Sequence, residues 1–301
     1  MDIMSLLNAL PGACAQGLIW GIMAIGLYIT YKILDIADLT VDGTMCTGGA
    51  VCVVMMLSGH SVWVALLCAF IAGMLAGLIT GVFHTVMGIP AILAGILTQL
   101  ALYSINLRIM GRSNMPISVR KYDLLVTLLR IPEAICVILV FTAVLILILY
   151  WFFGTELGCS MRATGCNNHM ARAQGINTNF IKVLGLMLSN GIVALSSGLI
   201  SQYQGFADIN MGRGAIVIGL AAVIIGDVVF GKLFRNFALK LVAVVLGAVL
   251  YYIVIQFVLW LGLNTDDLKL LTALVVGIFL SIPHIKGKYF TRPGKAAAKD
   301  A

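Results

Sequence analysis

The chain has 301 residues, of which 61% are hydrophobic and only 10% are charged, and its mean hydropathy is +1.07. A soluble domain carries about a quarter charged residues, so this composition excludes a water-soluble globular protein and predicts a polytopic membrane protein. The formal net charge is +7, and the basic residues that produce it lie largely between the apolar segments. This placement indicates orientation in, and contact with, a lipid membrane and gives no reason to expect a nucleic-acid partner.

The apolar segments run to about 20 residues without period-two alternation, which favours transmembrane helices over a β-barrel. We therefore predict an all-α fold with one transmembrane domain over residues 1–285 and a basic tail over 286–301. Eight to ten helices are expected, and about nine segments can be placed, at 11–34, 43–59, 61–83, 90–109, 133–153, 179–203, 213–231, 239–260 and 268–284. In the third segment, Gly73, Gly77 and Gly81 recur every four residues, a pattern typical of closely packed helices.

The distribution of basic residues predicts the orientation. With the N-terminus outside and the C-terminus in the cytoplasm, 12 of the 19 lysines and arginines face the cytoplasm and 7 face outward. The positive-inside rule favours this arrangement, in which the tail 286–301 is cytoplasmic. The loop 110–132 is basic for an outer loop and is the weakest part of the assignment.

Three aspartates follow the first apolar segment, in the stretch "ILDIADLTVDG", Ile33 to Gly43. A charged carboxylate at the centre of a bilayer costs roughly 2.5–3.5 kcal/mol on insertion scales. Asp38 and Asp42 therefore need either protein partners or a water-filled cavity. Their presence indicates that the helix is interrupted here, because irregular backbone is tolerated at membrane depth only inside protein or beside water.

A second stretch repeats this pattern. "ADLTVDGTMCTGGAV" starts at Ala37 and "ADINMGRGAIVIGLA" starts at Ala207, 170 residues later. Each follows a long apolar segment and leads into another that contains glycine. Five segments lie between them, so the copies run in opposite directions through the bilayer. We predict an inverted repeat with halves at about 11–153 and 179–284, whose interrupted helices meet inside the membrane.

The polar residues at these interruptions allow two roles. They could line a substrate pathway, or they could cap the broken helix ends without touching a solute. The sequence leaves both roles open. The candidate pathway residues are Asp38, Asp42, Gln204, Asp208 and Asn210.

The polar stretch 154–178 joins the fifth and sixth segments on the predicted cytoplasmic face. Within it, "NNHMARAQG" predicts a short helix with Asn167 or Asn168 as N-cap and Gly175 at the C′ position. Such a helix is marginal alone. It needs a surface to dock on, either the underside of this protein or another protein.

No pattern predicts catalysis. "GDVVFGKL", from Gly226, nearly matches a phosphate-binding loop, but Leu233 replaces the hydroxyl that would hold magnesium and a membrane helix precedes it. The four histidines lack metal-ligand spacing. We therefore expect no catalytic residue, no metal site and no bound cofactor in this chain.

Three stretches carry a family resemblance: "MRATGCNNHMARAQGIN" from Met161, "YKILDIADLTVDGTMCTGGAV", and "SQYQGFADINMGRGAIVIGLAAVIIGD". They resemble inner-membrane permeases of ABC importers of the branched-chain amino acid and ribose permease family. One branch, described as tryptophan or tyrosine importers, is the most similar. The resemblance runs from about Gly17 to Asp227. Cys166 and His169 stand where we expect the pattern to vary.

This resemblance implies a transport subunit in the cell membrane that is not itself an enzyme. It implies a homodimer, or a heterodimer with a close relative, with cytoplasmic ATPase subunits that bind ATP and magnesium and an extracellular solute-binding protein. The solute would be small and polar, and an amino acid, including an aromatic one, fits the branch. The segment 154–178 would be the coupling loop that contacts the ATPase, with Arg162, Gly165, Met170, Ala171, Arg172 and Gly175 as its matching residues.

Two alternatives come from the residues alone. An ion-coupled secondary transporter could use the same inverted repeat, with the aspartates as ion or proton sites. A membrane-embedded enzyme is the least supported, because no catalytic grouping is present.

Overall fold

The computed structural model describes residues 3–119, 122–231, 233–234 and 236–261, with residues 270, 273–274, 276–278 and 281 beyond them. Seven helices in this part of the chain are long and apolar enough to cross a membrane. The prediction of an all-α polytopic membrane protein is therefore confirmed. The predicted ninth segment lies mostly, and the tail 286–301 entirely, outside the described residues. The elements are α1 (Ile3–Tyr28), the π-helical turn η1 (Ile29–Ile33), α2 (Thr40–Leu57), α3 (Val62–Thr85), α4 (Ala91–Met110), β1 (Asn114–Pro116), α5 (Ile131–Gly154), α6 (Glu156–Cys166), α7 (Asn168–Ala173), α8 (Thr178–Gln204), β2 (Phe206–Asp208), α9 (Ala215–Phe230) and α10 (Phe237–Trp260).

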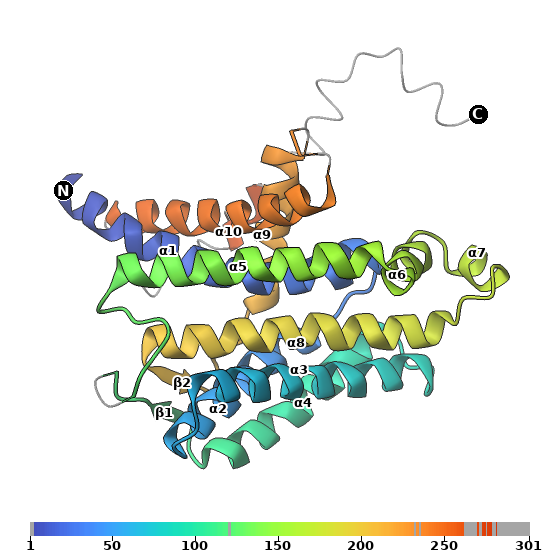
Figure 1. The fold of residues 1–301 in the computed structure, drawn as a ribbon, viewed down its shortest axis with the longest axis horizontal. Helices are drawn as coiled ribbons and strands as arrows, with labels where there is room; N and C mark the ends of the chain where they lie inside the picture. The colour runs from blue at the N-terminus through green and yellow to red at the C-terminus, as the bar shows by residue number, and fades with distance from the viewer. Residues whose placement is uncertain are drawn as a thin grey trace.

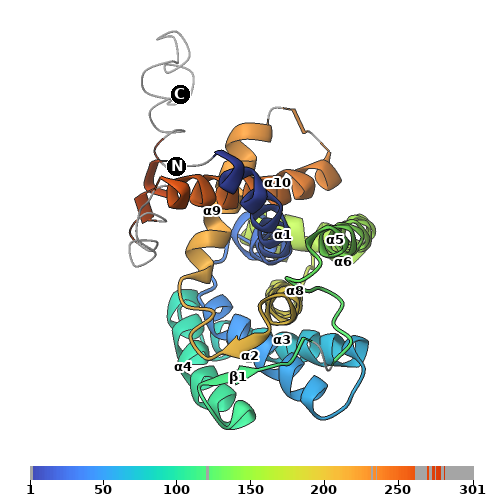
Figure 2. The same cartoon turned by 90° about the vertical axis from the view of Figure 1, so that its left-hand side faces the viewer.

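Helix α8 forms the centre of the bundle, between α1 on one side and α2 and α3 on the other (Figure 2). Glycines make this close packing possible. A Cβ atom added at Gly77 of α3 would overlap the carbonyl oxygen of Leu186, and one at Gly48 of α2 would overlap the backbone of Ala194. The four-residue glycine spacing predicted from the sequence thus serves helix packing within this chain.

The helices are interrupted at two places. After η1, residues 34–39 are irregular and Asp35 has a φ of 55°. After α8, the chain forms β2 and a turn at 209–214 before α9 begins. Helices α1 and α8, which lead into the two interruptions, run antiparallel in the bundle (Figure 1). This matches the predicted opposite directions of the two copies, and the repeat itself stays a prediction.

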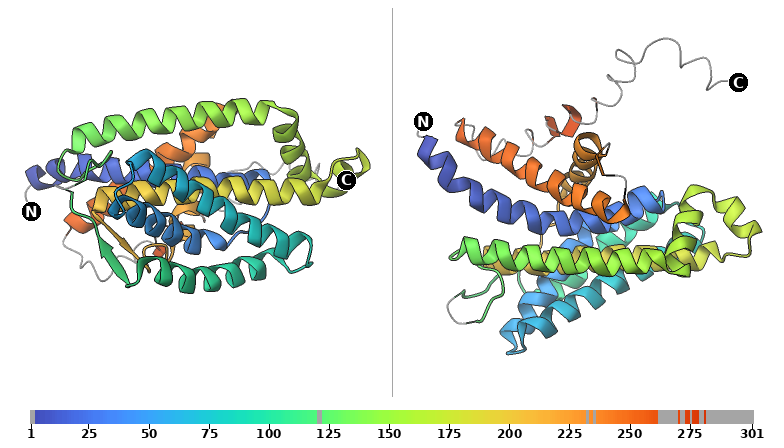
Figure 3. Two further views of the ribbon diagram at one scale, coloured as in Figure 1. Left: turned by 60° about the horizontal axis from the view of Figure 1, so that its bottom comes forward. Right: turned by 45° about the horizontal axis from the view of Figure 1, so that its top comes forward.

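The two ends of the bundle carry different structures. Strands β1 and β2 pair antiparallel, with Asn114 opposite Asp208 and Pro116 opposite Phe206. This short ribbon lies at one end of the bundle, and α6 and α7 lie at the opposite end (Figures 1 and 3). The ribbon joins the end of α4 to the segment that leads into α9.

Candidate functional site

The first interruption is sealed inside the protein. Asp38 is only 2% exposed. Its Oδ1 accepts the backbone N–H of Thr40 (2.9 Å) at the start of α2, and its Oδ2 accepts a hydrogen bond from the side-chain amide of Asn190 on α8 (2.7 Å). The Oδ1 of Asn190 in turn accepts the hydroxyl of Thr44 (2.7 Å). Each polar group named here has a partner, so the buried carboxylate holds α2 against α8.

A second polar cluster lies beside this network. The hydroxyls of Thr40 and Thr80 are 2.7 Å apart, and the Thr80 hydroxyl donates to that of Thr98 at 2.9 Å. These three buried side chains come from α2, α3 and α4. This cluster joins the start of α2 to α3 and α4, and the bond between Asp38 and Asn190 joins it to α8.

The second interruption meets α2 one turn further along. The Oδ2 of Asp42 accepts the backbone N–H of Gly214, and its Oδ1 accepts that of Ile216, each at 3.0 Å. The thiol of Cys46 donates to the carbonyl of Ile209 at 2.9 Å. A Cβ atom added at Gly212 would overlap the carbonyl oxygen of Asp42. Asp42, in the first half of the chain, thus caps the N-terminus of α9 in the second half.

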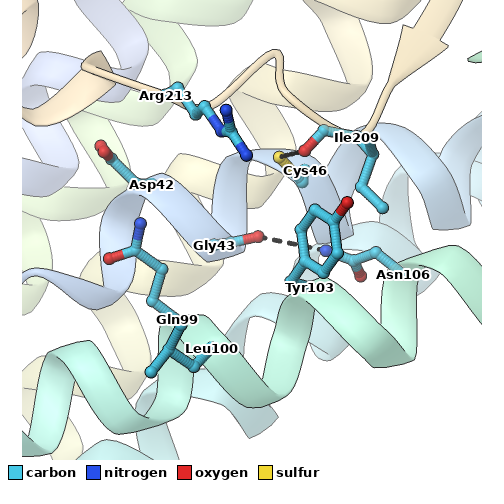
Figure 4. Close-up of a pocket in the computed structure, with 9 residues that line it drawn as sticks. All are labelled: Asp42, Gly43, Cys46, Gln99, Leu100, Tyr103, Asn106, Ile209 and Arg213. Carbon is cyan, nitrogen blue, oxygen red and sulfur yellow. Dashed lines mark hydrogen bonds between the residues drawn. The ribbon is translucent and has the colours of Figure 1, made fainter. Parts of the chain in front are cut away.

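A cavity of about 300 Å³ opens beside this junction. Figure 4 shows its walls: α2 at the back, α4 below, and the 209–214 segment above. Along α4, Gln99 lies about 12 Å from the first residue of a helix about 30 Å long at 1.5 Å per residue. The cavity therefore lies near the middle of the bundle's depth. Its lining residues are Asp42, Gly43, Cys46, Gln99, Leu100, Tyr103, Asn106, Ile209 and Arg213.

Opposite charges stand on the cavity walls. The carboxylate of Asp42 and the guanidinium of Arg213 both lie at its edge (Figure 4), and Arg213 forms no salt bridge with any described residue. Asn106 is fully buried. Its amide nitrogen donates to the carbonyl of Gly43 at 3.4 Å, and its Oδ1 has no hydrogen-bond partner among the described residues. The walls thus offer an anion and a cation, and the residue behind them, Asn106, keeps a buried acceptor without a partner among the described residues.

The structure separates the predicted pathway residues. Only Asp42 lines this cavity. Asp38 belongs to the sealed network, whereas Gln204 is exposed at the end of α8. Asp208 accepts the backbone N–H of Asn210 at 2.7 Å, and neither of these two residues lines the cavity. The sequence left helix capping and pathway lining open as alternatives. Asp42 caps the start of α9 and also lines the cavity.

Most residues of the cavity wall were not among the predicted pathway residues. Gln99, Tyr103 and Asn106 lie at i, i+4 and i+7 on α4, which places them on one helix face. That spacing is visible in the sequence and could have indicated a polar stripe. Arg213 gave no such signal, because its neighbours along the chain do not show which helix faces it.

The polar segment 154–178 contains two helices instead of one. The short predicted helix is α7: Asn167 accepts the backbone N–H of Met170 at 3.0 Å as its N-cap, and Gly175 follows with a φ of 83°. Helix α6 precedes it and was expected as loop. A Cβ atom at Gly165 on α6 would overlap the carbonyl oxygen of Ile33 in η1. The segment is thus docked against the first interruption.

The six predicted coupling residues have different surroundings. Arg162 stacks over the rings of Phe153 and Phe237, with its guanidinium carbon 5.5 and 4.4 Å from the ring centroids. Ala171 is buried, and Met170 is 63% exposed. Arg172 donates to side-chain oxygens of the residues that open α8 (2.8 and 3.2 Å). Met170 therefore offers an exposed apolar side chain to a partner protein.

Comparison with known proteins shows the family to which this chain belongs. A family model described as the branched-chain amino acid transport system permease component matches residues 11–282. The chain belongs to this permease family. It is the multi-pass, plasma-membrane permease subunit of an ABC importer, a transport component and not an enzyme, and such subunits work with ATPase and substrate-binding partners.

Individual relatives are also similar to this permease. It is 40% identical over 91% of both chains to a tyrosine transport system permease protein of Clostridioides difficile. It is 36% identical to the uncharacterized protein RP368 of Rickettsia prowazekii, over 93% of this chain and 99% of that one. A galactofuranose transporter permease of Escherichia coli is 29% identical over 58% of this chain and 50% of its own length.

Proposed function

We propose that this permease subunit carries an aromatic amino acid, with tyrosine as the first candidate. The observation that carries this proposal is the 40% identity, over 91% of both chains, to a tyrosine transport system permease. The cavity supports it. Its volume of about 300 Å³ stands at the lower end of the range for small-molecule sites, which suits one small solute.

The charges of the cavity also suit an amino acid. A zwitterion carries an ammonium group that pairs with a carboxylate such as Asp42, and a carboxylate that pairs with a guanidinium such as Arg213. Tyr103 adds an aromatic face on the α4 wall. We propose Asp42, Gln99, Tyr103, Asn106 and Arg213 as the pathway residues.

The assembly follows from the same proposal. Two copies of the chain form a homodimer, ATPase subunits contact α7, and a solute-binding protein contacts the end that carries β1 and β2. The N-terminus then lies outside. The position of Met170 on the exposed side of α7 supports the ATPase contact. If α7 faces the ATPase, the start of α1 at the opposite end of the bundle (Figure 1) supports an outer N-terminus.

Reconstitution tests the cargo. The tagged permease is purified from its native membrane, its co-purifying ATPase and binding protein are identified by mass spectrometry, and the complex is placed in proteoliposomes. We expect tyrosine uptake that requires ATP. Uptake that runs on an ion gradient without ATP would favour the ion-coupled alternative, and uptake of another solute alone would disprove the cargo.

A substitution tests the coupling loop. Proline at Gly175 cannot adopt the observed φ of 83°, and it removes the N–H that donates to the carbonyl of Arg172 at 3.0 Å. We expect Gly175→Pro to insert normally but to lose ATPase association. The control is Gly175→Asn. Asparagine tolerates a positive φ and keeps the backbone N–H, so this variant should still bind the ATPase.

A further inference from the structure

The side chain of Asp42 has two roles that oppose each other. Its oxygens accept the backbone N–H groups of Gly214 and Ile216, at 3.0 Å each, and thereby tie α2 to the start of α9. The same carboxylate lies on the cavity wall. Any cation that enters the cavity competes with these N–H groups for Asp42, because hydrogen bonds between two charged groups are stronger than those to a neutral amide.

The N-terminus of α9 needs an anion when Asp42 turns away. Its free N–H groups carry the positive end of the helix dipole, and Arg213, whose guanidinium has no salt bridge to a described residue, lines the same cavity. The cavity also holds the fully buried Asn106, whose Oδ1 has no partner among the described residues. A buried acceptor without a partner is uncommon in folded proteins, and this one belongs to a residue of the cavity lining.

We propose that the substrate's α-carboxylate replaces Asp42 on the N–H groups of Gly214 and Ile216, beside Arg213, while Asp42 pairs with the substrate's ammonium group. This inference rests on the proposed function and deepens it. The tie between α2 and α9 is exchanged for two contacts that pass through the substrate, and it re-forms when the substrate leaves. Occupancy of the cavity is thereby linked to the position of α9.

The proposal specifies the substrate class. Both charged groups of an α-amino acid are required, because an amine alone leaves the α9 N-terminus without an anion, and an acid alone competes with Asp42 on a site that is already satisfied. Tyrosine should therefore bind, whereas tyramine, which lacks the carboxylate, and 3-(4-hydroxyphenyl)propionate, which lacks the ammonium group, should not.

The thiol of Cys46 reports occupancy. It lines the cavity, next to the carbonyl of Ile209. In membranes that contain the intact transporter, alkylation by N-ethylmaleimide is followed at each cysteine by peptide mass spectrometry, with the exposed Cys159 of α6 as internal control. We expect tyrosine to slow alkylation of Cys46 several-fold, with Cys159 unchanged, and the two analogues at the same concentration to have no effect.

Three variants complete the test. Asp42→Asn keeps an acceptor oxygen but removes the charge, and Arg213→Gln removes the cation, so each should lose the protection by tyrosine. The matched control is Asp208→Asn, at an aspartate that accepts a backbone N–H but does not line the cavity, and it should keep the protection. Protection by either analogue as strong as that by tyrosine, or protection retained in both cavity variants, would overturn the proposal.

The same assay separates this inference from the cargo assignment. If the reconstituted complex takes up no tyrosine with ATP, the proposed cargo is wrong, and alkylation is repeated with each proteinogenic amino acid. Protection by another amino acid that is lost in Asp42→Asn would support the exchange with a different cargo. Protection by none would overturn it.

Discussion

The two interruptions use the same local turn in opposite surroundings. Asp38 accepts the N–H of the residue two positions on, Thr40, and Asp208 does the same with Asn210. Asp38 is 2% exposed and also held by Asn190, whereas Asn210 is exposed. The motif therefore sets the backbone, and the packing around it decides whether the segment is fixed or borders open space.

The difference lies in what covers each interruption. Helices α3, α4 and α8 surround the start of α2 and supply its polar partners. The 209–214 segment contacts α2 through Ile209 and contacts Ser197 and Ser201 of α8 through Met211, and its residues Ile209 and Arg213 also border the cavity. A sealed interruption fixes the fold, and one that borders a cavity leaves room for a solute.

The largest effect is expected for Asp38→Ala. It leaves the N–H of Thr40 buried without an acceptor, and the Asn190 amide keeps only its bond to the carbonyl of Leu186. Each lost bond should lower the free energy of unfolding by about 1–3 kcal/mol. Asp208→Ala should cost about 1 kcal/mol or less, because water can replace the acceptor at an exposed turn. Thermal unfolding in detergent, followed by circular dichroism, compares the two. Equal losses would show that the surroundings do not distinguish them.

Gly212→Ala tests the contact between the two interruptions. The added Cβ atom would overlap the carbonyl oxygen of Asp42, so the 209–214 segment must shift. This shift should lower the free energy of unfolding by about 1–3 kcal/mol. We expect reduced uptake in proteoliposomes as well as a lower unfolding temperature. The control is Gly154→Ala, whose Cβ atom would have no neighbour within 4 Å. Normal uptake by Gly212→Ala would show that this contact is dispensable.

Thr80→Val tests the polar cluster at the sealed interruption. The substitution removes a hydroxyl that lies 2.7 Å from the Thr40 hydroxyl and donates a hydrogen bond to the Thr98 hydroxyl. Its loss should lower the free energy of unfolding by about 1 kcal/mol. The matched control, Thr142→Val, removes a buried hydroxyl that bonds only to Ile138 in its own helix. Its loss of stability should be smaller. A larger loss in the control would show that the cluster contributes little between helices.

The smallest effect is expected at the ion pair between Lys32 of η1 and Asp227 of α9, which are 2.9 Å apart and partly exposed. Such pairs contribute at most about 1 kcal/mol. Asp227→Asn should lower the unfolding temperature slightly at low salt and hardly at all at high salt, because salt screens exposed charges. A salt-independent loss would point to a different role for Asp227.

Local features were predictable and distant contacts were not. The Asn167 cap, Gly175 after α7 and most helix ends follow from neighbours along the chain, which the sequence shows directly. The cap that Asp42 provides for Gly214 joins residues 172 positions apart. The stacking of Arg162 on Phe237 is of the same kind. No spacing rule connects such pairs, so the sequence marked Asp42 as unusual without identifying its partner.

The β1–β2 ribbon has a mechanical consequence for the cavity. It joins the end of α4, one wall, to the segment before α9, the opposite wall, through paired backbone groups at Asn114 and Asp208. The paired strands therefore hold the two walls together at that end of the bundle. Widening the gap while the strands stay paired requires rotation about this edge, so the largest displacement falls at the far end of the bundle, towards α6 and α7.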